Sequence, residues 1–156
     1  MVAIPTRISW RHTYIGIADA NAEWRRTLRA MCNTLGAVEV IDAGDGATFM
    51  QAATNFGKGL DLLLVDDGMT PMTGLLMVRH IRATANHPSR RAAAILMPAS
   101  ADTDTLRQAL SCGFHGVIPK PFSAQVMGDR AERILSQPML WQETDGVLLP
   151  LMPKQS

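Results

Sequence analysis

The sequence predicts an α/β protein with one doubly wound parallel β-sheet and helices on both of its faces. Short apolar runs alternate along the chain with longer segments whose apolar residues recur every three or four positions. This alternation is typical of strands that take turns with amphipathic helices. The run Leu62-Leu63-Leu64-Val65 is apolar at every position and ends on Asp66. An unbroken apolar run of this length indicates a strand that is buried on both faces of a parallel sheet.

The first half of the chain is expected to hold three strands and two helices. The strand-like segments are residues 14–18, 38–42 and 60–65, and the helical segments are residues 22–35 and 47–56. Gly36 follows the first helix, where glycine commonly ends a helix. The apolar positions expected to face the core are Trp24, Leu28, Met31 and Leu35 in the first helix and Phe49, Ala53 and Phe56 in the second.

The second half repeats the alternation. Strands are expected over residues 92–97 and 115–118, and helices over 74–83, from 102 or 103 up to Gly113, and 122–136. Pro119 lies beside the fifth strand and is tolerated only at a sheet edge, so this strand is expected to be the last in the sheet. The inward positions are expected to be Leu75, Val78 and Ile81, then Leu106 and Leu110, then Met127, Ala131 and Ile134.

Composition narrows the class of protein. The chain has 156 residues, of which 47% are hydrophobic and 19% charged, and its formal net charge is +1. A balance this neutral gives no electrostatic reason to expect a nucleic-acid or membrane partner. Cys32 and Cys112 are the only cysteines, which suggests a reducing compartment. No apolar run reaches membrane-spanning length and residues 1–13 lack a signal-peptide pattern, so a cytoplasmic location is expected.

Three regions are expected along the chain. Residues 1–13 form an N-terminal extension, residues 14–136 form the α/β domain, and residues 137–156 form a C-terminal tail. The tail contains prolines but also many apolar residues, so we expect it to dock on its own domain or on a partner.

Three polar side chains are expected to converge. Asp19 follows the first strand, Asp66 ends the third and Lys120 follows the fifth. The carboxyl ends of parallel strands lie at one edge of a sheet, which is where ligands bind in open α/β folds. Two carboxylates and one ammonium group can together hold a divalent cation and an anionic oxygen.

At these residues the chain resembles the receiver domain of bacterial response regulators. The segment Asp66-Asp67-Gly68-Met69-Thr70-Pro71-Met72-Thr73-Gly74 resembles the phospho-acceptor loop of that family, and Ile118-Pro119-Lys120-Pro121-Phe122 matches its Lys-Pro-Phe signature. The resemblance covers residues 14–136 and implies a flavodoxin-like sheet with strand order 2-1-3-4-5. It further implies phosphorylation of Asp66 by a histidine kinase or phosphotransfer protein, phosphoryl contact by Lys120, and a downstream protein target. Mg²⁺ would be held by Asp19, Asp66 and the Gly68 carbonyl.

The sequence departs from the family pattern at three functional positions. Ala20 replaces the acid that contacts Mg²⁺ most directly, which should weaken metal binding. Pro98 stands where the family has Thr or Ser, and Val117 where it often has Tyr or Phe. Two versions therefore stay open. In one, Asp66 is phosphorylated and signals by another route. In the other, the domain is a degenerate receiver that works by protein contact without phosphorylation.

Other functions are less favoured. Asp66-Asp67-Gly68-Met69-Thr70 weakly resembles the aspartate-nucleophile motif of haloacid-dehalogenase-type phosphatases, but Gly68 stands where that motif has its second acid. An enzyme is therefore not expected. The residues after the last helix are too few for a helix-turn-helix, so the expected output is a protein contact. Homodimer formation through the C-terminal tail or through the last strand and helix is a further expectation.

Overall fold

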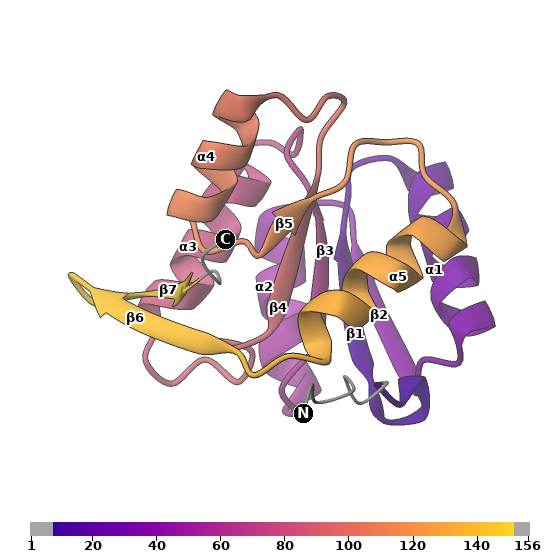
Figure 1. Cartoon of the computed structure of the whole chain (residues 1–156), viewed down its shortest axis with the longest axis horizontal. Helices are drawn as coiled ribbons and strands as arrows, with labels where there is room; N and C mark the ends of the chain where they lie inside the picture. The colour runs from indigo at the N-terminus through magenta and orange to yellow at the C-terminus, as the bar shows by residue number, and fades with distance from the viewer. Residues whose placement is uncertain (1–7, 152–156) are drawn as a thin grey trace, which may run out of the picture.

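In the computed structural model, which describes residues 8–151, a five-stranded parallel sheet forms the centre of the fold (Figure 1). Its strand order is β2-β1-β3-β4-β5, as the family resemblance implied. β5 has only two residues and lies at the edge, as Pro119 had predicted. The strands are β1 (Tyr14–Ala18), β2 (Glu39–Ala43), β3 (Leu62–Asp66), β4 (Ala93–Met97) and β5 (Gly116–Val117).

Five α-helices follow the strands, and each begins at a residue whose side chain caps it. The side chains of these N-cap residues accept a hydrogen bond from the backbone N–H three residues later, which satisfies an otherwise unpaired donor. A short 3₁₀ turn, Trp10–His12, precedes β1. The helices and their caps are α1 (Ala22–Leu35, Asn21), α2 (Gly46–Phe56, Asp45), α3 (Gly74–Ala83, Thr73), α4 (Thr103–Ser111, Asp102) and α5 (Ala124–Leu135, Ser123).

The helices divide between the two faces of the sheet and create two cores. Residues of α1 and α5 pack on one face, and residues of α2, α3 and α4 pack on the other. The strands alternate between these cores: Leu62 and Leu64 of β3 face α1 and α5, whereas Leu63 and Val65 face the opposite side. Every residue of β3 and β4 is buried, which explains why their sequences are apolar without alternation.

Two sequence expectations were wrong. Leu106 was expected to face inward, but it is 42% exposed, and Ala109 is the buried residue of α4. Every residue of α4 before Ala109 except Thr105 is exposed, so Leu106 lies in the part of the helix that does not pack in the core. The second error concerns residues 137–151, where no strands were expected.

These residues form a β-hairpin of two antiparallel strands, β6 (Leu140–Thr144) and β7 (Val147–Leu151). Asp145 and Gly146 connect the strands with φ values of 52° and 79°. Positive φ at both central residues is the geometry of a type I′ turn, which suits the twist of a hairpin. The hairpin lies beside α3 and α4 at one end of the domain (Figure 1).

Contacts from Trp141 and Leu148 attach the hairpin to the domain. Leu148 is only 4% exposed. The Trp141 ring lies 4.6 Å from the guanidinium carbon of Arg82 and meets the His115 ring edge-on at 5.2 Å. Arg82 itself is fully buried and donates hydrogen bonds to the backbone carbonyls of Arg90, Ala92 and Gly113. The hairpin therefore covers a buried cation that has only carbonyl and aromatic partners among the described residues.

Candidate functional site

Asp66 lies at the carboxyl end of β3 with its side chain almost enclosed. The residue is 8% exposed. The start of α3 packs directly against its backbone, because a Cβ atom added to Gly74 would lie 2.0 Å from the Asp66 carbonyl oxygen. Only glycine allows this approach. The close contact between β3 and α3 therefore holds the backbone of Asp66 in place.

Lys120 brings Asp19 and Asp66 together. Its backbone N–H donates to the Pro98 carbonyl at 2.9 Å, which attaches the segment after β5 to the end of β4. Its Nζ atom lies 2.8 Å from Asp19 Oδ2 and 3.0 Å from Asp66 Oδ1. The three side chains expected to meet at the strand ends do meet. We call Asp19, Asp66 and Lys120 the acidic cluster.

Charge in the cluster is balanced mainly by Lys120. Burial on its own lowers the pKa of Lys120, but hydrogen bonds to Asp19 and Asp66 outweigh this effect and raise it above the ordinary value. The ammonium group is therefore charged at neutral pH. Partial burial of its carboxyl group raises the pKa of the neighbouring Asp67, and the Asp66 carboxylate acts in the same direction.

Asp19 is fully buried and uses both of its carboxylate oxygens. Oδ1 accepts the backbone N–H of Asn21 at 2.8 Å, and Oδ2 accepts from Lys120. Its own N–H donates to the Ala43 carbonyl at 3.1 Å. Each oxygen of Asp19 thus has one protein donor, and these contacts fix the orientation of the side chain.

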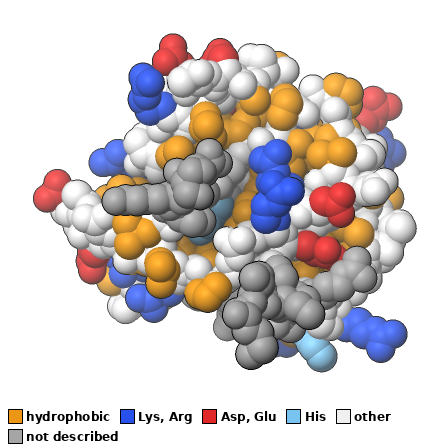
Figure 2. All heavy atoms as spheres, in the orientation of Figure 1, with side chains coloured by type: hydrophobic (Ala, Val, Ile, Leu, Met, Phe, Trp, Pro, Cys, Tyr) orange, Lys and Arg blue, Asp and Glu red, His pale blue; other side chains and the backbone are white. Residues whose placement is uncertain are grey.

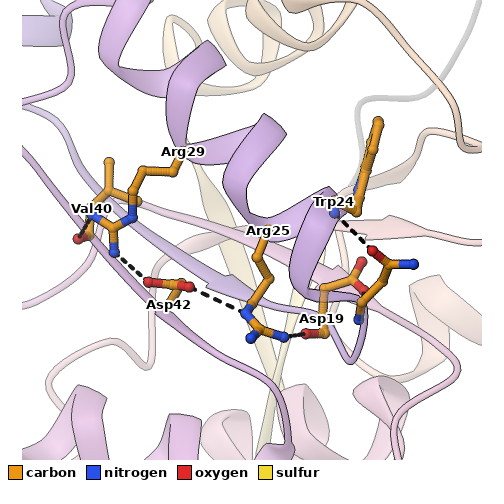
Figure 3. Close-up of polar contacts among 7 residues, drawn as sticks. Asp19, Trp24, Arg25, Arg29, Val40 and Asp42 are labelled. Carbon is orange, nitrogen blue, oxygen red and sulfur yellow. Dashed lines mark hydrogen bonds and ion pairs between the residues drawn. The ribbon is translucent and has the colours of Figure 1, made fainter.

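Arg25 and Asp42 form a second layer of charge beside the cluster (Figure 3). Arg25 Nη1 donates to the backbone carbonyl of Asp19 at 2.6 Å, and its Nε lies 3.3 Å from Asp42 Oδ2. Arg29 forms an ion pair with the other oxygen of Asp42 and also donates to the Val40 carbonyl at 3.0 Å. These contacts fasten α1 to the end of β2 and orient the backbone of Asp19.

Sequence reasoning missed Arg25 and Asp42. Arg25 lies one turn after the helix cap Asn21, and its side chain reaches back to the Asp19 carbonyl at the end of β1. Asp42 lies next to the end of β2. Its position relative to its strand resembles that of Asp19 and Asp66, and this signal was available in the sequence.

The donors available for Mg²⁺ are few. Oδ2 of Asp66 lies beside Gly68, because a Cβ on Gly68 would be 3.3 Å from it. Ala20 is exposed and offers no oxygen from its side chain. Within residues 8–151, no three His, Cys, Asp or Glu side chains are grouped to hold a metal. Mg²⁺ is often bound by one or two carboxylates, with water and phosphate oxygens completing its shell. Asp66 supplies one such carboxylate at the end of β3.

Pro98 and Val117 are the other two departures from the family pattern. Pro98 directly follows β4 and is buried, so no hydroxyl is present at that position. Ser100 lies two residues further on and is exposed. Val117 is 7% exposed and belongs to the core on the side of α2, α3 and α4. Neither position carries a polar side chain to contact a group bound at Asp66.

Comparisons with known proteins identify the class. The family model of the response regulator receiver domain matches residues 15–132. Chemotaxis protein CheY of Pseudomonas aeruginosa is 30% identical over 123 residues, which span 78% of this chain and 94% of that protein. Chemotaxis protein CheY-3 of Vibrio cholerae is 26% identical over 122 residues, spanning 78% and 90% respectively. The chain belongs to the response regulator receiver domain family, which acts in two-component signalling.

Solved structures agree on the fold. Chemotaxis protein CheY4 of Vibrio cholerae superposes with a TM-score of 0.71 at 20% identity, covering 79% of this chain and 98% of that one. The receiver domain of the sensor histidine kinase PA1611 from Pseudomonas aeruginosa, solved with magnesium in its active-site cleft, gives a TM-score of 0.69 at 24% identity and covers 80% and 98%. Between residues 8 and 151, no helix is long and apolar enough to cross a membrane.

Proposed function

We propose that this receiver accepts a phosphoryl group on Asp66 from the phosphohistidine of a histidine kinase or phosphotransfer protein. The observation that carries the proposal is the placement of Lys120, whose Nζ lies 3.0 Å from one oxygen of Asp66. The output would be a contact with a downstream protein target. The curated relatives that match are chemotaxis proteins, which supports a signalling role.

The chemistry follows from the two oxygens of Asp66. Oδ1 is held by Lys120, so Oδ2, beside Gly68, is the oxygen that attacks phosphorus. The new Oδ2–P bond forms as the N–P bond of phosphohistidine breaks, and the departing imidazole takes up a proton. The Lys120 ammonium stabilises negative charge on the phosphoryl oxygens during transfer, which is the main catalytic requirement of phosphoryl transfer.

Asp66 and the Gly68 carbonyl are the groups that would hold Mg²⁺, with Asp19 acting from outside through its fixed charge. When bound, Mg²⁺ supplies positive charge to the phosphoryl oxygens. The PA1611 receiver was solved with magnesium in its active-site cleft, which supports a magnesium site in this domain without naming its ligands. Because Ala20 lacks a carboxylate and both oxygens of Asp19 have protein partners, the affinity for the ion should be low.

A second candidate function is a degenerate receiver that binds its partners without phosphorylation. The observation favouring it is the absence of a hydroxyl at Pro98, together with the alanine at position 20. In this case Lys120 would serve only to neutralise Asp19 and Asp66.

A second copy of this chain is a further candidate partner. The two copies would contact each other through the C-terminal tail or through the last strand and helix.

Incubation with acetyl phosphate and Mg²⁺, followed by intact-mass measurement, separates the two candidates. Phosphoryl transfer predicts a mass gain of one phosphoryl group in the wild type that Asp66→Asn lacks. Asp67→Asn is the matched control, since it alters the exposed neighbouring acid and should keep the mass gain. No gain at saturating Mg²⁺, with the protein folded, would support the degenerate receiver.

A further inference from the structure

The β6–β7 hairpin is an addition to the receiver domain. The family model ends at residue 132, whereas the hairpin spans Leu140–Leu151. The hairpin therefore lies outside the region that the family model describes, and its two strands pair only with each other in the described structure. A two-stranded hairpin has only marginal stability by itself, and each strand of this hairpin has one edge that pairs with no other strand of the described structure.

The turn determines which backbone groups of β6 point outward. In a hairpin closed by a two-residue turn, the residues flanking the turn form a hydrogen-bonded pair, and the pairs then alternate. Thr144 and Val147 flank the turn here, and Trp141 is opposite Pro150. Counting from the turn, the N–H and C=O groups of Trp141 and Glu143 point away from β7. Pro150 also occupies an outward position in this register. Its missing N–H therefore removes no hydrogen bond between β6 and β7.

The two outer edges differ in their capacity to pair. β7 lies beside α3 and α4, and its outer edge lacks one donor at Pro150. β6 carries no proline, glycine, lysine or bulge, and all of its residues except Trp141 are exposed. Natural proteins protect such an edge with one of these features or with other charged side chains, and the single charge of β6 is Glu143. Within the described residues, no backbone hydrogen bond outside the hairpin involves Trp141 or Glu143.

We propose that β6 pairs with β6 of a second copy of this chain, antiparallel, about a two-fold axis at Gln142. This refines the proposed homodimer and does not depend on phosphoryl transfer. In this register all five residues of β6 pair, with Trp141 opposite Glu143 of the other copy and Leu140 opposite Thr144.

Side-chain complementarity favours this register and a second copy as the occupant. If one strand is displaced by two residues in one direction, Glu143 lies opposite Glu143 of the other copy, and these like charges repel each other. The shift in the other direction leaves Glu143 and Thr144 without partners in β6 of the other copy. In the proposed register no like charges face each other.

The apolar surface of the hairpin is consistent with such an interface. Alternation along the strands places Leu140, Val147, Leu149 and Leu151 on the face opposite Trp141 and Leu148. Leu140 is 62% exposed and Leu151 is 47% exposed. Figure 2 shows hydrophobic side chains on the surface over the hairpin. Pairing of β6 brings Leu140 against Thr144 and Gln142 of the other copy and reduces its exposure.

The test uses the full chain and one variant that blocks only the outer edge. Glu143→Pro removes an N–H that points away from β7, so the hairpin keeps its own hydrogen bonds. Light scattering should give a dimer for the wild type and at least about tenfold weaker association for Glu143→Pro, because both copies lose a hydrogen bond. Glu143→Ala is the matched control. It loses the 3.5 Å ion pair with Arg90 but keeps the N–H, and it should remain dimeric.

Cross-linking then tests the register. At a non-hydrogen-bonded antiparallel pair the Cα atoms lie about 4.5 Å apart, within reach of a disulfide. In a Cys112→Ser background, Gln142→Cys should form a covalent dimer on mild oxidation, whereas Leu140→Cys should not. A monomeric wild type overturns the proposal. A dimer that survives Glu143→Pro, or that Gln142→Cys fails to link, also overturns it and leaves the last strand and helix as the interface. None of these outcomes bears on the mass gain expected at Asp66.

Discussion

We predict that the buried imidazole of His115 makes the stability of this fold sensitive to mild acid. The residue is 8% exposed, and its Nδ1 accepts the Ala94 backbone N–H at 3.2 Å, a bond that requires an unprotonated nitrogen. Burial lowers the pKa of His115 from 6.5 to about 3, and the nearby Arg82 cation acts in the same direction. Protonation would place two cations side by side under the hairpin.

The sign and size of this change in stability follow from the coupling between protonation of His115 and unfolding. Because the folded pKa is depressed, the stabilisation is complete above the unfolded pKa of 6.5 and is lost as the pH falls toward 3. Lowering the pH from about 7 to about 5 should reduce the free energy of unfolding by about 2 kcal/mol through this residue alone. The helix-capping acids Asp45 and Asp102, whose pKa values are lowered from 3.8 mainly by backbone hydrogen bonds, contribute only in stronger acid.

Urea unfolding followed by tryptophan fluorescence at both pH values measures this loss. His115→Gln retains an acceptor for the Ala94 N–H but does not titrate, so most of the pH dependence should disappear. A small remainder is expected from His87, whose pKa is lowered by burial. His12→Gln, at an exposed position, should behave like the wild type. An equal loss of stability in wild type and His115→Gln would refute the reasoning.

Three further outcomes are expected. Gly74→Ala should destabilise the fold by about 1–3 kcal/mol, because its Cβ would lie 2.0 Å from the Asp66 carbonyl oxygen; an unchanged urea midpoint would contradict that contact. Trp141→Ala should cost about 2 kcal/mol through lost packing and cation–π contact, whereas the adjacent Leu140→Ala should cost well under half as much in the same assay. Ala20→Asp should strengthen Mg²⁺ binding measured by calorimetry, and unaltered affinity would show that position 20 is not near the ion.

The alternation of strands and helices could be predicted because each element carries its own periodicity. β3 and β4 are apolar at every position, and the first helix shows one clear apolar face. The convergence of Asp19, Asp66 and Lys120 followed from a single topological rule about strand ends. The error at Leu106 arose in a nine-residue helix, where so few apolar positions do not define one face.

The hairpin could have been predicted from a local signal that was overlooked. Asp145-Gly146 is a preferred type I′ turn sequence and stands between two segments suited to strands. The prolines around it favoured the interpretation as a tail, although Pro150 is compatible with an outward edge position. In contrast, the burial of Arg82 had no sequence signal, because its partners are backbone carbonyls from three distant positions.

Binding of beryllofluoride, an analogue of the aspartyl phosphoryl group, tests the central claim about Asp66 most directly. Amide chemical shifts would be recorded with Mg²⁺ present, for the wild type and for Asp66→Asn. Phosphoryl acceptance predicts shifts in the wild type at Gly68, at Lys120 and in the first turn of α3, and none in Asp66→Asn. An unchanged wild-type spectrum, or the same shifts in both proteins, would contradict the account.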